Sequence, residues 1–197
     1  MSPAVQRSQD ALTDARAQLA AYLKIFPDER SELLELQAQF EANDPGLLLR
    51  SNMRGHITTS GIVFDDVAGK VLMIHHRGLG RWLQPGGHHE GSDPLDRSAA
   101  REVIEETGVT DLLRHPWPLA AEAPFDIETH FIPANPSKAE GDHWHHDFIY
   151  LFTADSGAPL SPQWTEVAGV QWMDLRAFES LPIGRFGRIA RKLKALA

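Results

Sequence analysis

Gly86–Val109, with the sequence GGHHEGSDPLDRSAAREVIEETGV, is the most informative stretch of this 197-residue chain. Its second half predicts a helix that begins near Asp93-Pro94 and ends at Gly108. Aspartate caps helix N-termini, proline is tolerated in the first turn, and glycine adopts the left-handed conformation that closes a helix. On such a helix Glu102, Glu105 and Glu106 lie three and four residues apart, so they share one face.

This cluster of carboxylates favours a divalent cation. Like charges at these spacings destabilise a helix by roughly 0.2–0.5 kcal/mol per pair, so the cluster is unfavourable until a cation neutralises it. Carboxylate oxygens are hard ligands, which suit Mg²⁺ or Mn²⁺ better than a softer metal. Cations held there can also hold the phosphate groups of a substrate.

The same residues resemble the Nudix box, G-x5-E-x7-R-E-U-x-E-E-x-G-U, in which U is aliphatic. All specified positions match except Asp93, which stands where the family has glutamate. The preceding segment Trp82-Leu83-Gln84-Pro85-Gly86-Gly87 is similar to the W-x-x-P-G-G lead-in of many members. In outline the resemblance covers residues 55–180. It implies an α/β fold, the Nudix-like α/β/α sandwich with a mixed β-sheet.

The resemblance also implies an activity, a divalent-metal-dependent pyrophosphohydrolase. Its substrate would be a nucleoside diphosphate linked to another moiety, of the nucleotide-sugar, ADP-ribose, dinucleotide or nucleoside triphosphate type. Metal binding is assigned to Glu102, Glu105, Glu106 and the backbone of Gly87. Arg101 is expected to orient Glu102 and Glu105 rather than to contact substrate. The alternative is a non-catalytic nucleotide-binding or sensing Nudix module, which usually carries a degraded box.

The sequence does not identify which residue acts as the general base. Family members use either a box glutamate or an acid on a distant loop. Glu140 is the candidate of the second kind, because it lies in a loop rich in proline, glycine and asparagine before a predicted strand. Glu166 resembles a glutamate often found before the last strand and is a further candidate for metal or substrate contact.

Histidine and tryptophan side chains supply candidates for substrate binding. His88 and His89 adjoin Gly87, where side chains often line the cleft, and Trp82 is a candidate for stacking on a base. His145 belongs to the segment His143–Asp147, whose imidazoles could bind a transition metal instead. Successive residues of a strand point to opposite faces, so His145 and His146 cannot both face one ion if they lie in a strand.

Composition limits the partners. The chain has 27 acidic and 19 basic residues and a formal charge of −8, which disfavours nonspecific nucleic-acid binding. The absence of cysteine excludes disulfides, thiolate zinc sites and the reaction of isopentenyl diphosphate isomerases, which share the fold but use a catalytic cysteine. No apolar run long enough to span a membrane is present, so we expect a cytoplasmic protein without a membrane partner.

Hydrophobic periodicity predicts a helical hairpin, residues 5–26 and 31–42, ahead of the catalytic domain. We therefore expect an N-terminal helical extension over residues 1–50 and a Nudix hydrolase domain over residues 51–197. The hairpin is expected either to cover the domain's own sheet or to form a homodimer interface. Strands are predicted at 56–64, 71–76, 120–132, 147–153 and 170–173, and helices at 175–180 and at the end of the chain.

Overall fold

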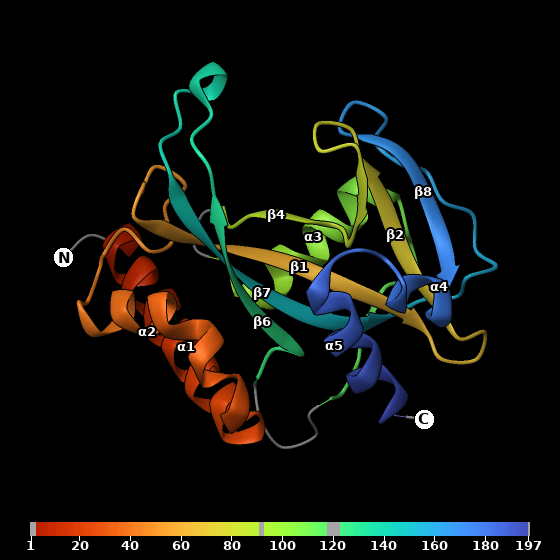
Figure 1. Cartoon of the computed structure of the whole chain (residues 1–197), viewed down its shortest axis with the longest axis horizontal. Helices are drawn as coiled ribbons and strands as arrows, with labels where there is room; N and C mark the ends of the chain where they lie inside the picture. The colour runs from red at the N-terminus through yellow and green to blue at the C-terminus, as the bar shows by residue number, and fades with distance from the viewer. Residues whose placement is uncertain (1–2, 91–92, 118–122, 197) are drawn as a thin grey trace. The chain divides into compact units, whose positions relative to one another are not determined.

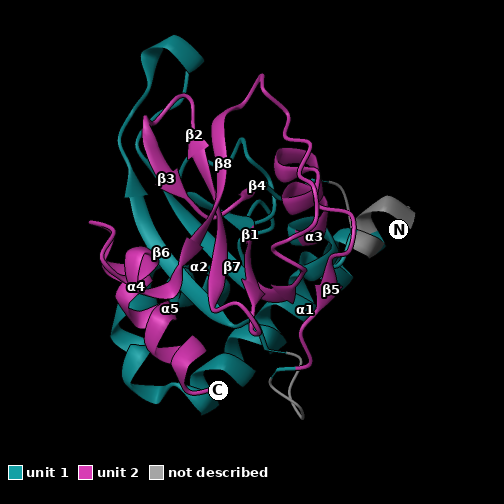
Figure 2. Ribbon diagram, turned by 90° about the vertical axis from the view of Figure 1, so that its right-hand side faces the viewer, with its two compact units in different colours: residues 1–59, 87–99, 117–149 teal, residues 60–86, 100–116, 150–197 magenta. Residues whose placement is uncertain are grey.

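The computed structural model describes residues 3–90, 93–117 and 123–196, and the chain divides into two compact units (Figure 2). Unit 1 consists of residues 1–59, 87–99 and 117–149, and unit 2 of residues 60–86, 100–116 and 150–197. Four of the described elements run from one unit into the other along the chain: β1 (Gly55–Asp65), β4 (Gly86–His88), α3 (Leu95–Thr107) and β7 (His143–Thr153).

The predicted hairpin of helices is present in unit 1, where α1 (Pro3–Ile25) lies beside α2 (Leu34–Glu41) in Figure 1. Pro27 ends α1 as predicted, because proline cannot continue a helix, and it opens the 3₁₀ helix η1 (Pro27–Leu33). The second predicted helix therefore begins as 3₁₀ structure. Arg16 joins α1 to the end of α2 by donating a 3.0 Å hydrogen bond to Asn43 Oδ1.

The sheet of unit 1 is built from β6 (Asp126–Ile132), which pairs antiparallel with the first part of β7. A connection that contains the 3₁₀ helix η2 (Pro136–Lys138) joins them. The predicted strand at 120–132 is thus confirmed over its second part, and residues 120–122 lie outside the described residues. Strand β7 is longer than predicted and begins at His143, so the histidine-rich segment is strand rather than loop.

The hairpin of helices contacts this sheet. Tyr22 of α1 is fully buried, and its hydroxyl donates a 2.9 Å hydrogen bond to Asp126 at the start of β6. This contact agrees with the first of the two arrangements expected for the hairpin, in which the helices cover the sheet of their own chain.

Unit 2 is centred on β2 (Lys70–His76), which pairs antiparallel with three other strands. These are the end of β1, β3 (Arg81–Leu83) and β8 (Val167–Asp174). The predicted turn between β1 and β2 is confirmed, with Gly69 at φ +66°. The carboxylate of Asp65 stabilises this turn by accepting a 2.8 Å hydrogen bond from the N–H of Ala68.

The remaining elements of unit 2 are short or terminal. Helices α4 (Leu175–Glu179) and α5 (Gly184–Lys194) were predicted, and they contact each other through the rings of Phe178 and Phe186, whose centroids lie 4.6 Å apart. Strand β5 (Leu113–Arg114) pairs with the end of β7. Neither β5 nor β3 was predicted from the sequence. Within residues 3–90, 93–117 and 123–196, none of the helices combines the length and apolar composition that crossing a bilayer requires.

Candidate functional site

Helix α3 carries the box, and its ends follow the local signals of the sequence. The N–H of Ser98 donates a hydrogen bond to the carbonyl of Pro94, which is the first bond of the helix. Pro94 therefore immediately precedes α3, whereas the sequence predicted it inside the first turn. Gly108 has φ +68° and closes the helix as predicted. A Cβ there would lie 2.3 Å from the carbonyl oxygen of Ser161, so the position also needs glycine for space.

Arg101 joins two of the three box glutamates. Its Nη1 lies 3.0 Å from Glu102 Oε1 and 3.3 Å from Glu105 Oε2. The two carboxylates differ in exposure, with 13% of the Glu102 side chain exposed and 49% of that of Glu105. A single guanidinium therefore holds these two carboxylates beside each other, which is the contact expected for Arg101.

Glu106 is the buried member of the cluster, with 4% of its surface exposed. Burial is the main cause that raises its pKa to about 8, and the charges of Glu102, Glu166 and Glu105 raise it further. Glu106 is thus mainly protonated at neutral pH, and Glu166 lies close enough to belong to the same acidic group.

This group of oxygens fits a hard divalent cation. It offers carboxylates from one rigid helix, and the proton on Glu106 can be displaced, because metal binding requires the deprotonated ligand. The charges of Glu102, Glu105 and Glu166 act on Glu106, and a Mg²⁺ or Mn²⁺ ion would neutralise this acidic group. Among the described residues, however, only His56, His143 and His145 bring three such ligand atoms within 4.8 Å of one another.

The lead-in segment before Gly87 is fixed by hydrogen bonds within unit 2. The N–H of Gly86 donates to Glu106 Oε2 at 2.8 Å, and the carbonyl of Pro85 accepts from the N–H of Gly61 at 3.0 Å. Gln84 is buried and accepts a 3.0 Å hydrogen bond from Arg185 of α5, a contact that no local sequence signal indicates. Gly87, the expected backbone ligand, follows Gly86 directly in the chain.

Trp82 lies on β3 and is partly buried. Its ring packs edge-on against His75, with 5.3 Å between the centroids, and a Cβ at Gly169 would lie 3.4 Å from it. Part of the indole surface of Trp82 therefore packs within unit 2. Only the rest of that surface could stack on a nucleotide base.

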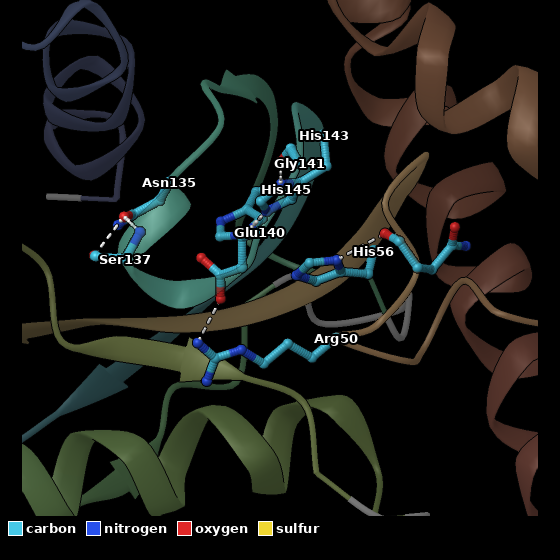
Figure 3. A network of polar contacts seen from close by, with 9 residues as sticks. Arg50, His56, Asn135, Ser137, Glu140, Gly141, His143 and His145 are labelled. Carbon is cyan, nitrogen blue, oxygen red and sulfur yellow. Dashed lines mark hydrogen bonds and ion pairs between the residues drawn. The ribbon is translucent and has the colours of Figure 1, made fainter.

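Glu140 lies in unit 1, in the connection between β6 and β7 (Figure 3). Its carboxylate accepts a 2.8 Å hydrogen bond from Arg50, and this bond is the main cause that lowers the pKa of Glu140. A carboxylate with a lowered pKa is a weaker base, so the pairing with Arg50 does not favour Glu140 as the general base.

The histidines of unit 1 converge on one place. The ring of His56, in β1, lies 5.0 Å from that of His143, 4.7 Å from that of His145 and 5.2 Å from that of His88 in β4 (Gly86–His88). Burial lowers the pKa of His88 to about 4 and that of His145 to about 2, so both imidazoles are neutral at physiological pH. His89 is also buried, with 4% of its surface exposed.

The alternation expected along the strand is confirmed. His143 and His145 share one face of β7, whereas His146 points to the other, where its ring nitrogens lie 2.7 Å from Gln39 Oε1 and 3.0 Å from Thr129 Oγ1. His56 and Arg50 are the members of this region that the sequence analysis missed. Their role depends on contacts between segments far apart in the chain, which no local pattern reveals.

Comparison with known proteins identifies the family. The sequence model of the NUDIX domain matches residues 55–194. Phosphatase NudJ of Escherichia coli K12 is 34% identical over 77 residues, which are 36% of this chain and 49% of NudJ. The chain thus spans about half the length of the curated relatives it matches.

Solved structures agree with this assignment. The Ap4A hydrolase of C. elegans, in a binary complex, has a TM-score of 0.53 and 20% identity over 71% of this chain and 96% of its own. A NUDIX-family hydrolase from Clostridium perfringens has a TM-score of 0.54 and 22% identity over 72% of this chain and 98% of its own. These identities speak for the fold alone, the predicted α/β/α sandwich with a mixed sheet. The chain belongs to the Nudix family, whose domain it carries over residues 55–194.

Proposed function

We propose that this protein is a divalent-metal-dependent pyrophosphohydrolase that cleaves a nucleoside diphosphate linked to another moiety. The observation that carries the proposal is the carboxylate group on α3, in which Arg101 joins Glu102 to Glu105 and Glu106 is buried with a pKa of about 8. The name of NudJ, a phosphatase 34% identical over 77 residues, supports hydrolysis at phosphorus.

The residues that would hold Mg²⁺ or Mn²⁺ are Glu102, Glu105, Glu106 and the backbone of Gly87. When bound, such cations supply charge neutralisation of the phosphates and lower the pKa of water. Arg101 keeps Glu102 and Glu105 in position, and the N–H of Gly86 keeps the Glu106 carboxyl group in position. Arg101 thus acts as a positioning residue.

We place the general base among the box glutamates. The attacking water gives up a proton as its oxygen bonds to phosphorus, and the phosphoanhydride P–O bond breaks to release the leaving phosphate group. We assign that proton to a carboxylate of the box, because Arg50 lowers the pKa of Glu140 and so makes Glu140 a weaker base. Glu140 remains the second candidate in this proposal.

Substrate contacts are assigned to Trp82, His88, His89 and His145. Trp82 offers an aromatic surface for a base, and the three imidazoles are candidates for contact with phosphate or ribose groups. His89 is buried, so a contact from it requires its ring to move toward the substrate. The same proposal includes a cytoplasmic location, a nucleotide-type small molecule as the partner, and a homodimer.

The test is a metal-controlled assay of the full chain. ADP-ribose, NADH, dinucleoside polyphosphates, CDP-alcohols and nucleoside triphosphates are incubated with Mg²⁺, Mn²⁺ or EDTA, and released phosphate or mononucleotide is measured. We expect turnover that requires metal and falls by at least about 10²-fold in Glu106→Gln, since changes to groups around a metal already cost 10–100-fold. The matched control is Glu179→Gln, whose carboxylate binds Lys194 at 2.7 Å.

Two results would overturn the proposal. One is turnover that persists in EDTA or in Glu106→Gln. The other is nucleotide binding in calorimetry without turnover of any substrate in the panel, which would establish the alternative, a nucleotide-binding or sensing module.

A further inference from the structure

Three imidazoles of unit 1 bring their ring nitrogens close together. One ligand atom from each of His56, His143 and His145 lies within 4.8 Å of the other two. Figure 3 shows these side chains facing one another from β1 and β7. His143 and His145 reach the same face because they are two residues apart on a strand.

The backbone fixes which nitrogen each ring presents. His56 Nδ1 lies 3.2 Å from the carbonyl oxygen of Asn52, and His143 Nδ1 lies 2.8 Å from that of Gly141. A carbonyl only accepts hydrogen bonds, so both Nδ1 atoms carry hydrogen, and in the neutral form of each ring Nε2 presents a lone pair. Metal-binding histidines are commonly oriented in this way, by a carbonyl on the nitrogen that does not bind the ion.

The Nε2 atom of His56 is left without a protein partner. His56 is 1% exposed, and its Nε2 is buried with no hydrogen bond among the described residues. A buried polar atom without a partner costs roughly 1–3 kcal/mol, a cost that a bound cation would offset. A cation at the centre of the three rings would accept this lone pair.

The spacing of the other two nitrogens fits such an ion. His143 Nε2 and His145 Nε2 lie 3.1 Å apart. Two imidazole nitrogens that bind one tetrahedral Zn²⁺ at 2.0–2.1 Å lie roughly 3.3–3.4 Å from each other. This contact is a hydrogen bond in which His145 Nε2 donates to His143 Nε2. Small side-chain movements, together with transfer of that hydrogen to Nδ1 of His145, let both Nε2 atoms contact the same ion.

We propose that His56, His143 and His145 form a binding site for a divalent transition-metal cation, of which Zn²⁺ is the probe. The donors are imidazole nitrogens, which prefer Zn²⁺, Co²⁺ or Ni²⁺ to the Mg²⁺ favoured by carboxylates. The site therefore differs in chemistry from the box glutamates. It assigns His145 to the ion in place of the substrate contact proposed above, and it does not depend on hydrolysis at the box.

The surroundings of the site are compatible with a bound cation. The charge of Arg50 acts on His56, but Arg50 is paired at 2.8 Å with Glu140, whose charge acts on His56 in the opposite direction. Three protein ligands leave one position of a tetrahedral zinc ion open, as in catalytic zinc sites. The ring of His88 lies 5.2 Å from that of His56 and 5.3 Å from that of His145, so His88 can fill that position or face a molecule bound there.

The test measures Zn²⁺ binding to the metal-stripped full chain by calorimetry, and Co²⁺ binding by visible absorption. We expect one Zn²⁺ per chain, with affinity at least tenfold lower in His143→Ala and in His145→Gln. The intense Co²⁺ absorption of a four-coordinate nitrogen site should be lost in the same variants. His115→Ala is the matched histidine control, and Glu106→Gln should keep the Zn²⁺ site while losing turnover.

Equal Zn²⁺ affinity in the wild type and in His145→Gln would overturn the proposal. So would loss of Zn²⁺ binding in Glu106→Gln, because the ion would then be held by the box. His145 is only partly buried, so His145→Gln remains informative if circular dichroism shows that His143→Ala does not fold. In that case Zn²⁺ should raise the melting temperature of the wild type and leave that of His145→Gln unchanged.

Discussion

The backbone N–H of Gly86 donates a 2.8 Å hydrogen bond to the carboxyl group of Glu106. This bond joins the box helix to the glycine pair that precedes the box loop. It favours the ionised carboxylate and so lowers the pKa of Glu106, but burial opposes it and has the larger effect. The resulting pKa of about 8 makes Glu106 a buried acid that holds a proton until a cation replaces it.

This proton makes the stability of the metal-free protein depend on pH. Glu106 titrates near pH 8 in the folded chain, against an ordinary value of 4.5. Between these values the folded state binds more protons than the unfolded state, so the contribution of Glu106 to the free energy of unfolding falls as pH rises. Glu106→Gln cannot ionise, and in EDTA at pH 8 it should be more stable than the wild type by on the order of 1–3 kcal/mol.

Denaturant unfolding at pH 5 and pH 8 measures this effect. The advantage of Glu106→Gln should shrink at pH 5, where the wild-type carboxyl group is protonated in the folded state. Glu179→Gln, on the exposed ion pair with Lys194, should show no such change with pH. A constant difference between Glu106→Gln and the wild type at both pH values would show that Glu106 is ionised in the fold.

Arg101 gives a second prediction, on turnover. Its Nη1 contacts Glu102 and Glu105 at 3.0 and 3.3 Å, so Arg101→Ala frees both side chains from a common partner. We expect turnover to fall about 10–100-fold, the usual cost of losing a group that orients metal ligands. Arg97→Ala, on the exposed side of the same helix, is the control and should keep wild-type turnover.

Arg101→Ala also changes metal binding, and in a favourable direction. Without the positive charge of Arg101 nearby, the carboxylates attract Mn²⁺ more strongly. Mn²⁺ affinity is therefore measured along with turnover. Tighter Mn²⁺ binding with unchanged turnover would show that Arg101 mainly competes with the ion and does not orient its ligands.

The box helix could be predicted from the sequence because its signals are local. The glycine at the end of α3 has the left-handed conformation expected of it, and Arg101 makes the contacts with Glu102 and Glu105 that the spacing allows. The first two strands and their turn were likewise predicted, because β-branched and aromatic residues mark the strands and a glycine marks the turn.

Only part of the histidine site could be predicted from the sequence, the imidazoles of His143–Asp147 as candidates for binding a transition metal, because His56 comes from a distant part of the chain. The glycine- and proline-rich segment before His143 resembles a loop, and only the pairing of β7 with β6 shows that the strand begins at His143. His56 has no local feature that connects it with His143 and His145. Strands β3, β4 and β5 contain two or three residues each, too few to show a period of two.

Gly61 gives a third prediction, on packing beneath the box helix. A Cβ added at Gly61 would lie 2.3 Å from Val103 Cγ2 and 3.1 Å from the ring of Phe152. Gly61→Ala should therefore lower the free energy of unfolding by about 1–3 kcal/mol, the usual cost of overpacking a core. It should also lower turnover, because Val103 lies on the helix that carries the glutamates. The control is Gly184→Ala, where a Cβ meets no heavy atom within 4 Å.

A second substitution makes this prediction specific. Val103→Ala removes the methyl group that the new Cβ would meet, so the double variant Gly61→Ala/Val103→Ala should lose less stability than the sum of the two single variants. Strictly additive losses in denaturant unfolding would contradict the clash between Gly61 and Val103.

The contact between Tyr22 and Asp126 gives a fourth prediction, on the role of the N-terminal helices. Both residues are fully buried, and the hydroxyl of Tyr22 lies 2.9 Å from Asp126 and also within hydrogen-bond contact of Glu29, so its one hydrogen is shared between two carboxyl groups. Tyr22→Phe removes a donor from a buried carboxyl group, so the free energy of unfolding should fall by about 1–3 kcal/mol. Thr13→Ala, which removes an exposed hydroxyl from the same helix, should have little effect.

Hydrogen exchange shows whether α1 and β6 form one cooperative part of the fold. If they do, Tyr22→Phe lowers the protection of amides in both elements by the same free energy, because both are exposed in the same opening event. Loss of protection confined to α1 would show that this helix detaches from β6 without opening it. The contact with Asp126 would then contribute to the docking of the helix and not to the stability of the sheet.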